Sequence, residues 1–298
     1  MKELALAGNP NSGKTSLFNL LTGSRQHVGN WPGVTVEKKS GLFRKNKEIV
    51  IQDLPGIYSL SPYTSEEMVS RNYLLSGNAD GILDVVDATN LERNLYLSLQ
   101  LIETGIPVVL ALNMSDVVEK QGKWIDTEKL SYQLGVPVVA TSALKKTGID
   151  QVMPKVLREM ERTDETLYPV YDSHFEAALS EIIRILGNAV PQKQARFYAI
   201  KLFERDKELS EQLVLSDFQK TEIEDAIRIT EEIYTEDAET IVVNARYEFI
   251  ESAVKMALQA DVTKLSLSDK IDRIVTNRYL ALPIFALVMW LVYFLSIQ

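Results

Sequence analysis

One stretch near the start of the chain limits its fold more than any other. Residues 8–15 read Gly-Asn-Pro-Asn-Ser-Gly-Lys-Thr, which matches the phosphate-binding loop pattern G-x-x-x-x-G-K-[S/T]. A short apolar run precedes it at residues 4–7, and residues 16–21 after it have helical composition. A strand, a glycine-rich loop and a helix in this order direct backbone N–H groups and the positive end of a helix at phosphate oxygens. The stretch predicts a nucleotide-binding domain of the α/β class.

Each residue of this loop has an expected task. Gly8 and Gly13 would let the backbone curl around the phosphates. Lys14 would reach the β- and γ-phosphates, and the hydroxyl of Thr15 would bind Mg²⁺. The candidate nucleotide contacts in the loop are Gly8, Asn9, Pro10, Asn11, Ser12, Gly13, Lys14, Thr15 and Ser16. The alternative is a glycine-rich turn that happens to precede a lysine, and the flanking strand and helix argue against it.

The stretch that follows the first predicted helix has the composition of a loop. Residues 24–40 contain glycines and a proline, which interrupt regular elements, so we expect a mobile loop there. Thr35 lies where a nucleotide-dependent switch would offer a hydroxyl to Mg²⁺ and a backbone N–H to the γ-phosphate. The candidate contacts in this loop are Gly33, Val34 and Thr35.

A second phosphate motif ends a predicted strand at residues 48–53. The four residues Asp53, Leu54, Pro55 and Gly56 match D-x-x-G and are candidate nucleotide contacts. Asp53 would hold Mg²⁺ through water, and the N–H of Gly56 would bind the γ-phosphate. Ile57 stands where many small GTPases have a glutamine that orients the attacking water. Because isoleucine cannot orient water, we expect slow intrinsic hydrolysis.

Two further features of this region have alternative interpretations. The side-chain carbonyl of Asn11 would either hold a monovalent cation against the phosphates or only cap local backbone, and the residues alone leave both open. Glu66 and Glu67 are possible catalytic acids. Thr64, three residues before Glu67, instead matches a capping box at the start of a helix, and we favour capping.

Two later motifs predict the base specificity. In the stretch Asn-Met-Ser-Asp at residues 113–116, the carboxylate of Asp116 can accept hydrogen bonds from N1–H and the amino group of guanine. Adenine offers neither donor there, so it would leave the carboxylate unpaired. After an apolar run at residues 137–141, the N–H of Ala143 could meet the guanine carbonyl oxygen. The candidate base contacts are Asn113, Met114, Asp116, Ser142, Ala143 and Leu144.

The pattern of apolar segments gives the domain organisation. Apolar runs at residues 82–87 and 107–113 alternate with predicted helices, which is typical of a mostly parallel sheet. The strand pattern then stops, and helical periodicity covers residues 173–186, 217–233 and 237–259. We therefore predict a P-loop GTPase fold of the Ras-like type, followed by a small acidic all-α domain. The predicted limits are 1–165 for the GTP-binding domain, 166–265 for the helical domain, 266–278 for a linker and 279–298 for a first transmembrane helix.

Composition excludes several classes of function. The formal net charge is −9, which argues against nucleic acid as a partner because phosphate contacts need clustered lysine and arginine. The chain has no cysteine and only two histidines, far apart in sequence. A thiolate or histidine-rich metal site within this chain is therefore excluded.

The last residues have the composition of a membrane helix. Residues 279–298 contain no charged side chain, and about 20 apolar residues can span a bilayer. Trp290 and Tyr293 are aromatic residues of the kind found at membrane interfaces. Basic residues precede the segment, which favours a cytoplasmic N-terminal side. We expect a transmembrane start, either of a tail anchor or of a longer membrane protein; a buried core helix is the alternative.

Taken together, these residues resemble the N-terminal part of the FeoB-type ferrous iron transporters. The resemblance depends on residues 8–19, 29–37, 53–56 and 113–116. It implies a GTP-hydrolysing regulatory module that gates or drives Fe²⁺ uptake, with a helical domain that tunes GDP affinity. It places the protein in the bacterial inner membrane, with residues 1–278 on the cytoplasmic side. The polytopic transport domain is missing from this sequence beyond one predicted span.

The resemblance also assigns cofactors, catalytic residues and partners. It implies Mg²⁺ bound by Thr15, Thr35 and Asp53, and hydrolysis stimulated by K⁺ with Asn11 as the cation ligand. The implied catalytic residues are Lys14, Thr35, Gly56 and Asn11. Partners would be GTP and GDP, the membrane, the chain's own membrane domain and small cytoplasmic accessory proteins, and a homo-oligomer is allowed. Two alternatives stay open: a nucleotide-sensing membrane scaffold with negligible turnover, and a soluble ribosome- or RNA-associated GTPase.

Overall fold

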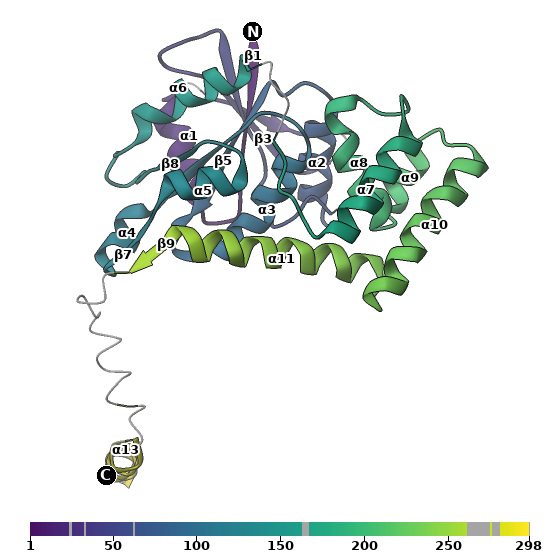
Figure 1. Cartoon of the computed structure of the whole chain (residues 1–298). Coiled ribbons are helices and arrows are strands. Elements are labelled where there is room, and N and C mark those ends of the chain that lie inside the picture. Colours follow the sequence, from purple (N-terminus) through teal and green to yellow (C-terminus); the bar gives the residue numbers. More distant parts are fainter. Residues whose placement is uncertain are drawn as a thin grey trace.

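The computed structural model describes most of the chain, as a sheet covered by helices with a group of further helices beside it (Figure 1). The described residues are 1–23, 26–32, 34–61, 63–162, 167–260, 275 and 281–297. The predicted linker at residues 266–278 lies outside this part, except for Val275.

Among the described residues, seven strands form one sheet in the order β2-β3-β4-β1-β5-β6-β8. The strands are β1 (Lys2–Gly8), β2 (Gln26–Asn30), β3 (Glu37–Leu42), β4 (Ile49–Asp53), β5 (Gly81–Asp87), β6 (Val108–Asn113) and β8 (Val138–Ala140). From β4 to β8 every neighbouring pair is parallel, whereas β2, β3 and β4 pair antiparallel. The mostly parallel sheet that the sequence predicts is confirmed.

Helices cover both faces of the sheet because its central strands are apolar on both sides. In β1, Leu4 and Leu6 join the apolar cluster beneath α1 and α6. Ala5 and Ala7 point the other way, into the cluster beneath α2, α3 and α5. The helices of this part are α1 (Lys14–Thr22), α2 (Ser65–Leu75), α3 (Leu91–Glu103), the short α4 (Ser115–Lys120), α5 (Thr127–Leu134) and α6 (Ile149–Met160).

The prediction that residues 24–40 form an irregular loop is wrong for much of this stretch. β2 occupies Gln26–Asn30, and β3 begins at Glu37, with Gly29 paired to Lys38. The glycine is accepted because β2 is the edge strand of the sheet, with a ladder on one side only. Pro32 and Thr35 lie between the two strands, and neither residue belongs to a helix or a strand.

The second part of the chain is helical, as predicted. It contains α7 (Ser173–Leu186), α8 (Ala195–Phe203), α9 (Lys207–Gln212), α10 (Asp217–Tyr234) and α11 (Ala238–Ala257). The sequence did not predict α8 and α9. It also extended the last helix to residue 259, whereas α11 ends at Ala257 and strand β9 (Leu258–Ala260) pairs with β7 (Lys123–Ile125).

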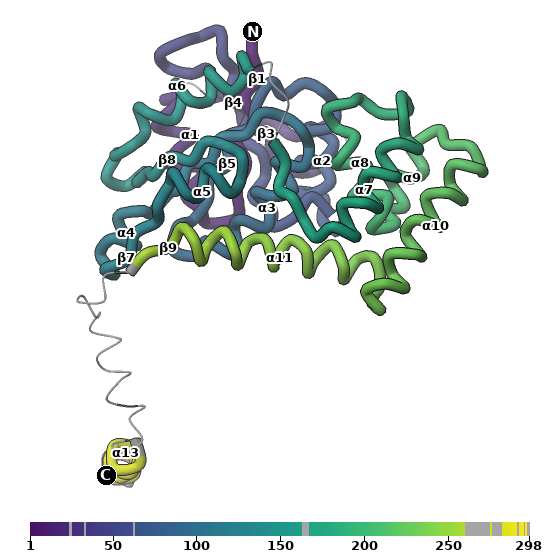
Figure 2. Tube along the Cα trace, in the orientation of Figure 1, coloured from purple at the N-terminus to yellow at the C-terminus, as the bar shows by residue number. Residues whose placement is uncertain are grey.

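Helix α11 joins the two parts, and Figure 2 shows it running along both. Its first half packs Ile241 and Val242 into the core of the helical part. Its second half packs Ile250, Ala253 and Val254 into the cluster under the sheet. The two parts therefore share one helix and are not separate packing units.

Buried charges lie where the two parts meet. Arg246 of α11 donates to Glu103 of α3 (2.7 Å) and to Glu204 after α8 (2.9 Å). The side chains of Arg246 and Glu103 are 1% and 0% exposed, and Tyr171 donates a further hydrogen bond to Glu103. Although burial disfavours its charge, the two carboxylates raise the pKa of Arg246 well above its usual value.

The C-terminal segment is described in part. The helix α13 (Ala281–Ile297) occupies most of the segment predicted to span a membrane, while residues 279, 280 and 298 are not described. Within the described ranges, no helix combines the length and the apolar character that a membrane crossing requires.

We expect the change Arg246→Ala to destabilise the fold by about 3–5 kcal/mol, because it leaves two carboxylates buried without their partner. Urea unfolding of the full chain measures this. The matched control is Arg228→Ala, since Arg228 pairs with Glu232 on the surface and exposed pairs are worth about 0–1 kcal/mol. Equal losses in the two variants would contradict this account of the buried pair.

An isolated carboxyl group lies within the sheet. Asp84 of β5 is 1% exposed and accepts a hydrogen bond from Ser98 Oγ of α3 at 2.5 Å. Burial raises the pKa of Asp84 from 3.8 to about 7, and the hydrogen bond from Ser98 acts in the opposite direction. At a pH between 3.8 and about 7, Asp84 binds a proton in the folded state and releases it in the unfolded state. The stability of the protein therefore falls as the pH rises through this range.

The change Asp84→Asn should remove this pH dependence. A shift from 3.8 to about 7 corresponds to about 4 kcal/mol, so we expect the variant to be more stable than the parent by up to that amount above neutral pH. The gain should be smaller near pH 5 than near pH 8. Urea unfolding at both pH values measures it, with the exposed Asp225→Asn as control. A gain that does not change with pH would contradict the prediction.

Candidate nucleotide-binding site

The phosphate loop lies between β1 and α1, at the edge of the sheet where the parallel strands end. Two glycines are required there because neighbouring atoms leave no room for a side chain. A Cβ on Gly8 (φ 147°) would lie 2.5 Å from Val85 O, and one on Gly13 (φ 90°) would lie 2.1 Å from Asn113 Nδ2. Asn11 also has a positive φ, 67°, which asparagine adopts more readily than most residues.

The structure brings the phosphate loop and the D-x-x-G motif together. β1 and β4 pair so that Leu6 lies beside Asp53. Lys14 Nζ donates to Asp53 Oδ1 and to Leu54 O, both at 2.5 Å. Burial raises the pKa of Asp53, and the ammonium of Lys14 counteracts this. A cation and a carboxylate, both buried, therefore meet where phosphate and Mg²⁺ were predicted to bind.

The remainder of the D-x-x-G segment rests against the phosphate loop. A Cβ on Gly56 would lie 3.3 Å from Pro10 Cα, so the two backbones are in close approach. Ile57 is 4% exposed and belongs to the apolar core. This agrees with the expectation that Ile57 does not orient water.

Asn113 links the phosphate loop to the predicted base-binding loop. Its Nδ2 donates to Ser12 O at 2.8 Å, and its Oδ1 accepts from Ala143 N at 2.9 Å. Both bonds are possible because β6, which ends at Asn113, lies between β5 and β8 in the sheet. One amide side chain thereby fixes the distance between the phosphate end and the base end of the site.

Asp116 lies beside this link, in the first turn of α4. It is 6% exposed, and Lys145 Nζ lies 3.5 Å from its Oδ2. The Ser142 hydroxyl and the ammonium of Lys145 lower the pKa of Asp116, so it is a carboxylate at neutral pH. The loop after β8 is closed by Ser142 and Thr147, which exchange two backbone hydrogen bonds. Leu144 at its tip is 87% exposed.

Several buried polar atoms at this edge of the sheet lack a hydrogen-bond partner among the described residues. They are Asn9 Nδ2, Ser12 Oγ, Thr141 Oγ1 and Asp116 Oδ2. Buried polar groups are nearly always hydrogen-bonded in native proteins. A bound nucleotide would satisfy the donors near the phosphate loop that have no partner. It would also satisfy Asp116 Oδ2 at the base end, whose contact here is the ion pair with Lys145 at 3.5 Å.

The segment with Thr35 is attached to α2 rather than to the phosphate loop. Trp31 is 8% exposed and packs its ring edge-on against Tyr73, with 5.4 Å between the ring centroids. Its backbone N–H donates to Val36 O at 2.9 Å. Thr35 is exposed and Val34 is half-buried, and no hydrogen bond joins the Thr35 side chain to Lys14 or Asp53 in the described part. Gly33 lies outside the described residues.

The interpretation of Glu67 as a capping residue is confirmed. Thr64 Oγ1 accepts from Glu67 N at 3.2 Å, and Glu67 Oε2 accepts from Thr64 N at 3.1 Å. The carboxylate of Glu67 is therefore engaged at the start of α2.

Sequence reasoning missed the residues that anchor the segment after Gly56. Gln100 of α3 accepts from Leu60 N at 2.7 Å and from Ser59 Oγ at 3.1 Å. Lys201 of α8 donates to Ser61 Oγ at 3.2 Å and to Glu204 at 2.6 Å. No local pattern could have identified these contacts with residues 59–61, because Gln100 and Lys201 lie 40 or more positions away from them in the sequence.

The donor set fits Mg²⁺ held mainly by phosphate. Among the described residues, no group of three or more histidine, cysteine, aspartate or glutamate side chains could hold a metal ion. Mg²⁺ typically takes one or two protein ligands together with substrate phosphates and water. Asp53 and the exposed Thr15 at the start of α1 provide such a carboxylate and hydroxyl.

Comparison with known protein families gives two matches that together span most of the chain. A family model described as ferrous iron transport protein B matches residues 2–156. A second, the FeoB cytosolic helical domain, matches residues 171–259.

Curated relatives of this chain carry the same family name as the two matching family models. The Fe(2+) transporter FeoB of Escherichia coli K12 is 39% identical over 311 residues, which cover 100% of this chain and 39% of the relative. A Fe(2+) transport protein A/FeoB fusion protein of Porphyromonas gingivalis W83 is 43% identical over 309 residues, covering 97% of this chain and 36% of the relative. The chain therefore spans a little over a third of the length of these relatives.

Solved structures show the same fold. A GDP-bound A143S mutant of the S. thermophilus FeoB G-domain superposes with a TM-score of 0.85 at 65% identity, covering 87% of this chain and 100% of that one. The mGMPPNP-bound NFeoB of S. thermophilus gives 0.79 at 66% identity, covering 86% and 97%. The P-loop GTPase fold, the two family matches and the identity to full-length relatives establish that this chain belongs to the FeoB family.

Proposed function

We propose that the chain is the GTP-binding and GTP-hydrolysing regulatory module of a ferrous iron transporter. The observation that supports this best is the position of Asn113, which holds the phosphate loop and the base loop at a fixed separation beside Asp116. The similar S. thermophilus proteins bound to GDP and to mGMPPNP support it further. A ribosome- or RNA-associated GTPase is not favoured, since the relatives are Fe(2+) transporters.

The chain's own residues would bind the phosphates. The backbone from Gly8 to Ser16, including Asn9, Pro10, Ser12 and Gly13, would surround the phosphate groups. Lys14 would exchange its contact with Asp53 for the β- and γ-phosphates, and this would release the carboxylate. Asp53, Thr15 and Thr35 would then hold Mg²⁺, which neutralises charge on the phosphates.

At the base end, Asp116 would accept both guanine donors, and Ala143 would donate its N–H to the guanine carbonyl oxygen. Met114 lies within 4.0 Å of a Cβ built on Gly13 and would cover the base from the phosphate side. Ser142 and Leu144 complete this loop.

Catalysis would rest on charge and on the two segments that contact the γ-phosphate. Asn11, on the exposed side of the phosphate loop, would hold K⁺ and so supply positive charge to the transition state. Thr35, with Gly33 and Val34, would close over the γ-phosphate, and Gly56, after Leu54 and Pro55, would report its loss. The intrinsic rate would be slow because Ile57 is part of the core.

The consequences of hydrolysis would reach the helical part through hydrogen bonds. Gln100 and Lys201 bind the segment that follows Gly56, so a change there would alter contacts with α3 and α8. We propose residues 1–165 as the GTPase domain and 166–265 as the part that tunes GDP affinity. Iron uptake, the inner-membrane location, the transport domain and accessory proteins such as the one fused in the P. gingivalis relative belong to the whole transporter.

The guanine assignment is tested by Asp116→Asn. Because asparagine cannot accept both guanine donors, we expect GDP affinity to fall by at least about 100-fold. Xanthosine diphosphate should bind the variant better than GDP does, since its C2 carbonyl can accept from the new amide. Competition binding with the full chain measures both, with the exposed neighbour Glu119→Gln as control. ADP that competes with the parent chain as well as GDP does would refute the assignment.

The role of Asn11 is tested by GTP hydrolysis in potassium and in sodium buffer. We expect faster turnover in potassium, and the change Asn11→Ala should reduce that advantage by about tenfold or more because the cation loses its ligand. The exposed Asn78→Ala should keep the response. An unchanged potassium response in Asn11→Ala would contradict the role, and binding without turnover in either buffer would favour a nucleotide-sensing scaffold.

A further inference from the structure

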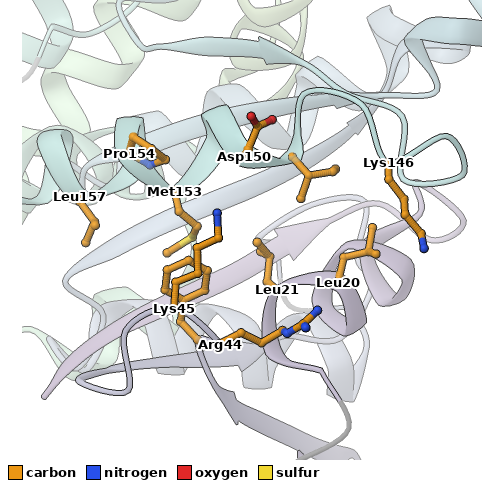
Figure 3. A pocket seen from close by; sticks show the side chains of 11 residues that line it. Leu20, Leu21, Arg44, Lys45, Lys146, Asp150, Met153, Pro154 and Leu157 are labelled. Carbon is orange, nitrogen blue, oxygen red and sulfur yellow. The ribbon is translucent and has the colours of Figure 1, made fainter.

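A cavity of about 680 Å³ lies away from the nucleotide site, between helices α1 and α6. Figure 3 shows it from close by: Leu20, Leu21 and Met153 face a common space, with Arg44, Lys45 and Lys146 around it. We call it the α1–α6 pocket. Its volume is in the range of small-molecule sites, and none of the motifs described above uses it.

The floor of the α1–α6 pocket is apolar and well packed. Leu21, Phe43 and Met153 line it and are only 3%, 7% and 3% exposed. They belong to the apolar cluster beneath the sheet face that α1 and α6 cover. An apolar group that enters the pocket would therefore extend an existing core and be removed from water.

The rim of the pocket is basic, and Arg44 within it is held in place. Arg44 N donates to Leu21 O at 3.0 Å, which attaches the turn between β3 and β4 to the end of α1. The aliphatic part of Arg44 packs over Gly23, where a Cβ would lie 3.3 Å from Arg44 Cδ. In the part of the chain that the structure describes, Arg44, Lys45 and Lys146 form no ion pair, and Asp150 is the one acid that lines the pocket.

We propose that the α1–α6 pocket binds an acyl-chain carboxylate, with its chain on the apolar floor and its headgroup at the basic rim. Charge complementarity favours an anion, and the recessed apolar floor favours a single flexible chain. A free ligand fits better than the surface of an anionic bilayer, because the apolar floor is buried beneath the rim and only a single chain can reach it.

This ligand would regulate the nucleotide site, an effect that rests on the proposed function. α1 begins at Lys14 of the phosphate loop, and α6 begins directly after the loop that contains Ala143 and Lys146. A chain inserted between these two helices acts on both segments that hold the nucleotide. Because coupling between two sites is reciprocal, GDP must change the affinity for the carboxylate by the same factor.

The experiment is a calorimetric titration of the full chain with dodecanoate below its micelle concentration. We expect one saturable site, weakened by about tenfold or more in the double variant Lys45→Glu, Lys146→Glu. Lys47→Glu is the matched control, since Lys47 lies exposed on the same turn but does not line the pocket. Leu20→Trp, which fills the pocket without changing charge, should also abolish binding while the circular dichroism spectrum stays the same.

A second titration uses dodecyltrimethylammonium, which has the same chain and the opposite charge. Equal binding of this cation, or undiminished dodecanoate binding in the double variant, would overturn the proposal. So would association with phosphatidylglycerol vesicles without binding of monomeric dodecanoate, which would assign the surface to the membrane.

Coupling is measured separately, as GDP affinity with and without saturating dodecanoate. We expect a change of at least about fivefold that disappears in Leu20→Trp. An unchanged GDP affinity would overturn the regulatory role alone. Failure of GDP to bind even without dodecanoate would instead contradict the proposed function, and the dodecanoate titration would still decide whether the pocket binds its ligand.

Discussion

The parallel pairing of β4, β1, β5, β6 and β8 is the constraint on which the rest of the structure depends. Parallel strands all end at the same edge of the sheet, and ligands bind there in open α/β folds. The phosphate loop follows β1, Asp53 ends β4, Asn113 ends β6, and Ser142 follows β8. The sheet thus assembles one site from motifs that are far apart in the sequence, and Asn113 then sets their separation.

The second organising feature is the buried charge between the sheet and the helical part. Burying ions is costly, and removing one partner leaves the other unpaired. Arg246, Glu103 and Glu204 satisfy one another, and Lys201 extends the group to Ser61 after the D-x-x-G motif. A displacement of that segment would therefore change the contacts of α8 and α11. This contact is the physical basis of our proposal that the helical part regulates the nucleotide site.

The residues that the sequence predicted for the site lie at one edge of the sheet, whereas parts of the surrounding structure differ from the prediction. Motif residues could be identified because phosphate, Mg²⁺ and guanine each demand particular groups at particular spacings, as at Lys14, Asp53 and Asp116. The strand at Gln26–Asn30 was missed because Gly29 is unfavourable in a strand in general, while an edge strand tolerates it. Helix α8 was missed because its apolar residues are buried all round, so it has no helical stripe to detect.

By itself, the sequence determined the fold class and predicted the chemistry, because local patterns encode glycine turns, apolar strands and the groups that are typical of nucleotide contacts. Only the tertiary structure decided which distant side chains meet. It placed Gln100 against Leu60, divided α11 between two cores, and surrounded the α1–α6 pocket with cations that have no partner among the described residues. These contacts depend on how helices pack on a sheet. Packing brings together residues that are not spaced at any regular interval in the sequence, so no sequence pattern predicts them.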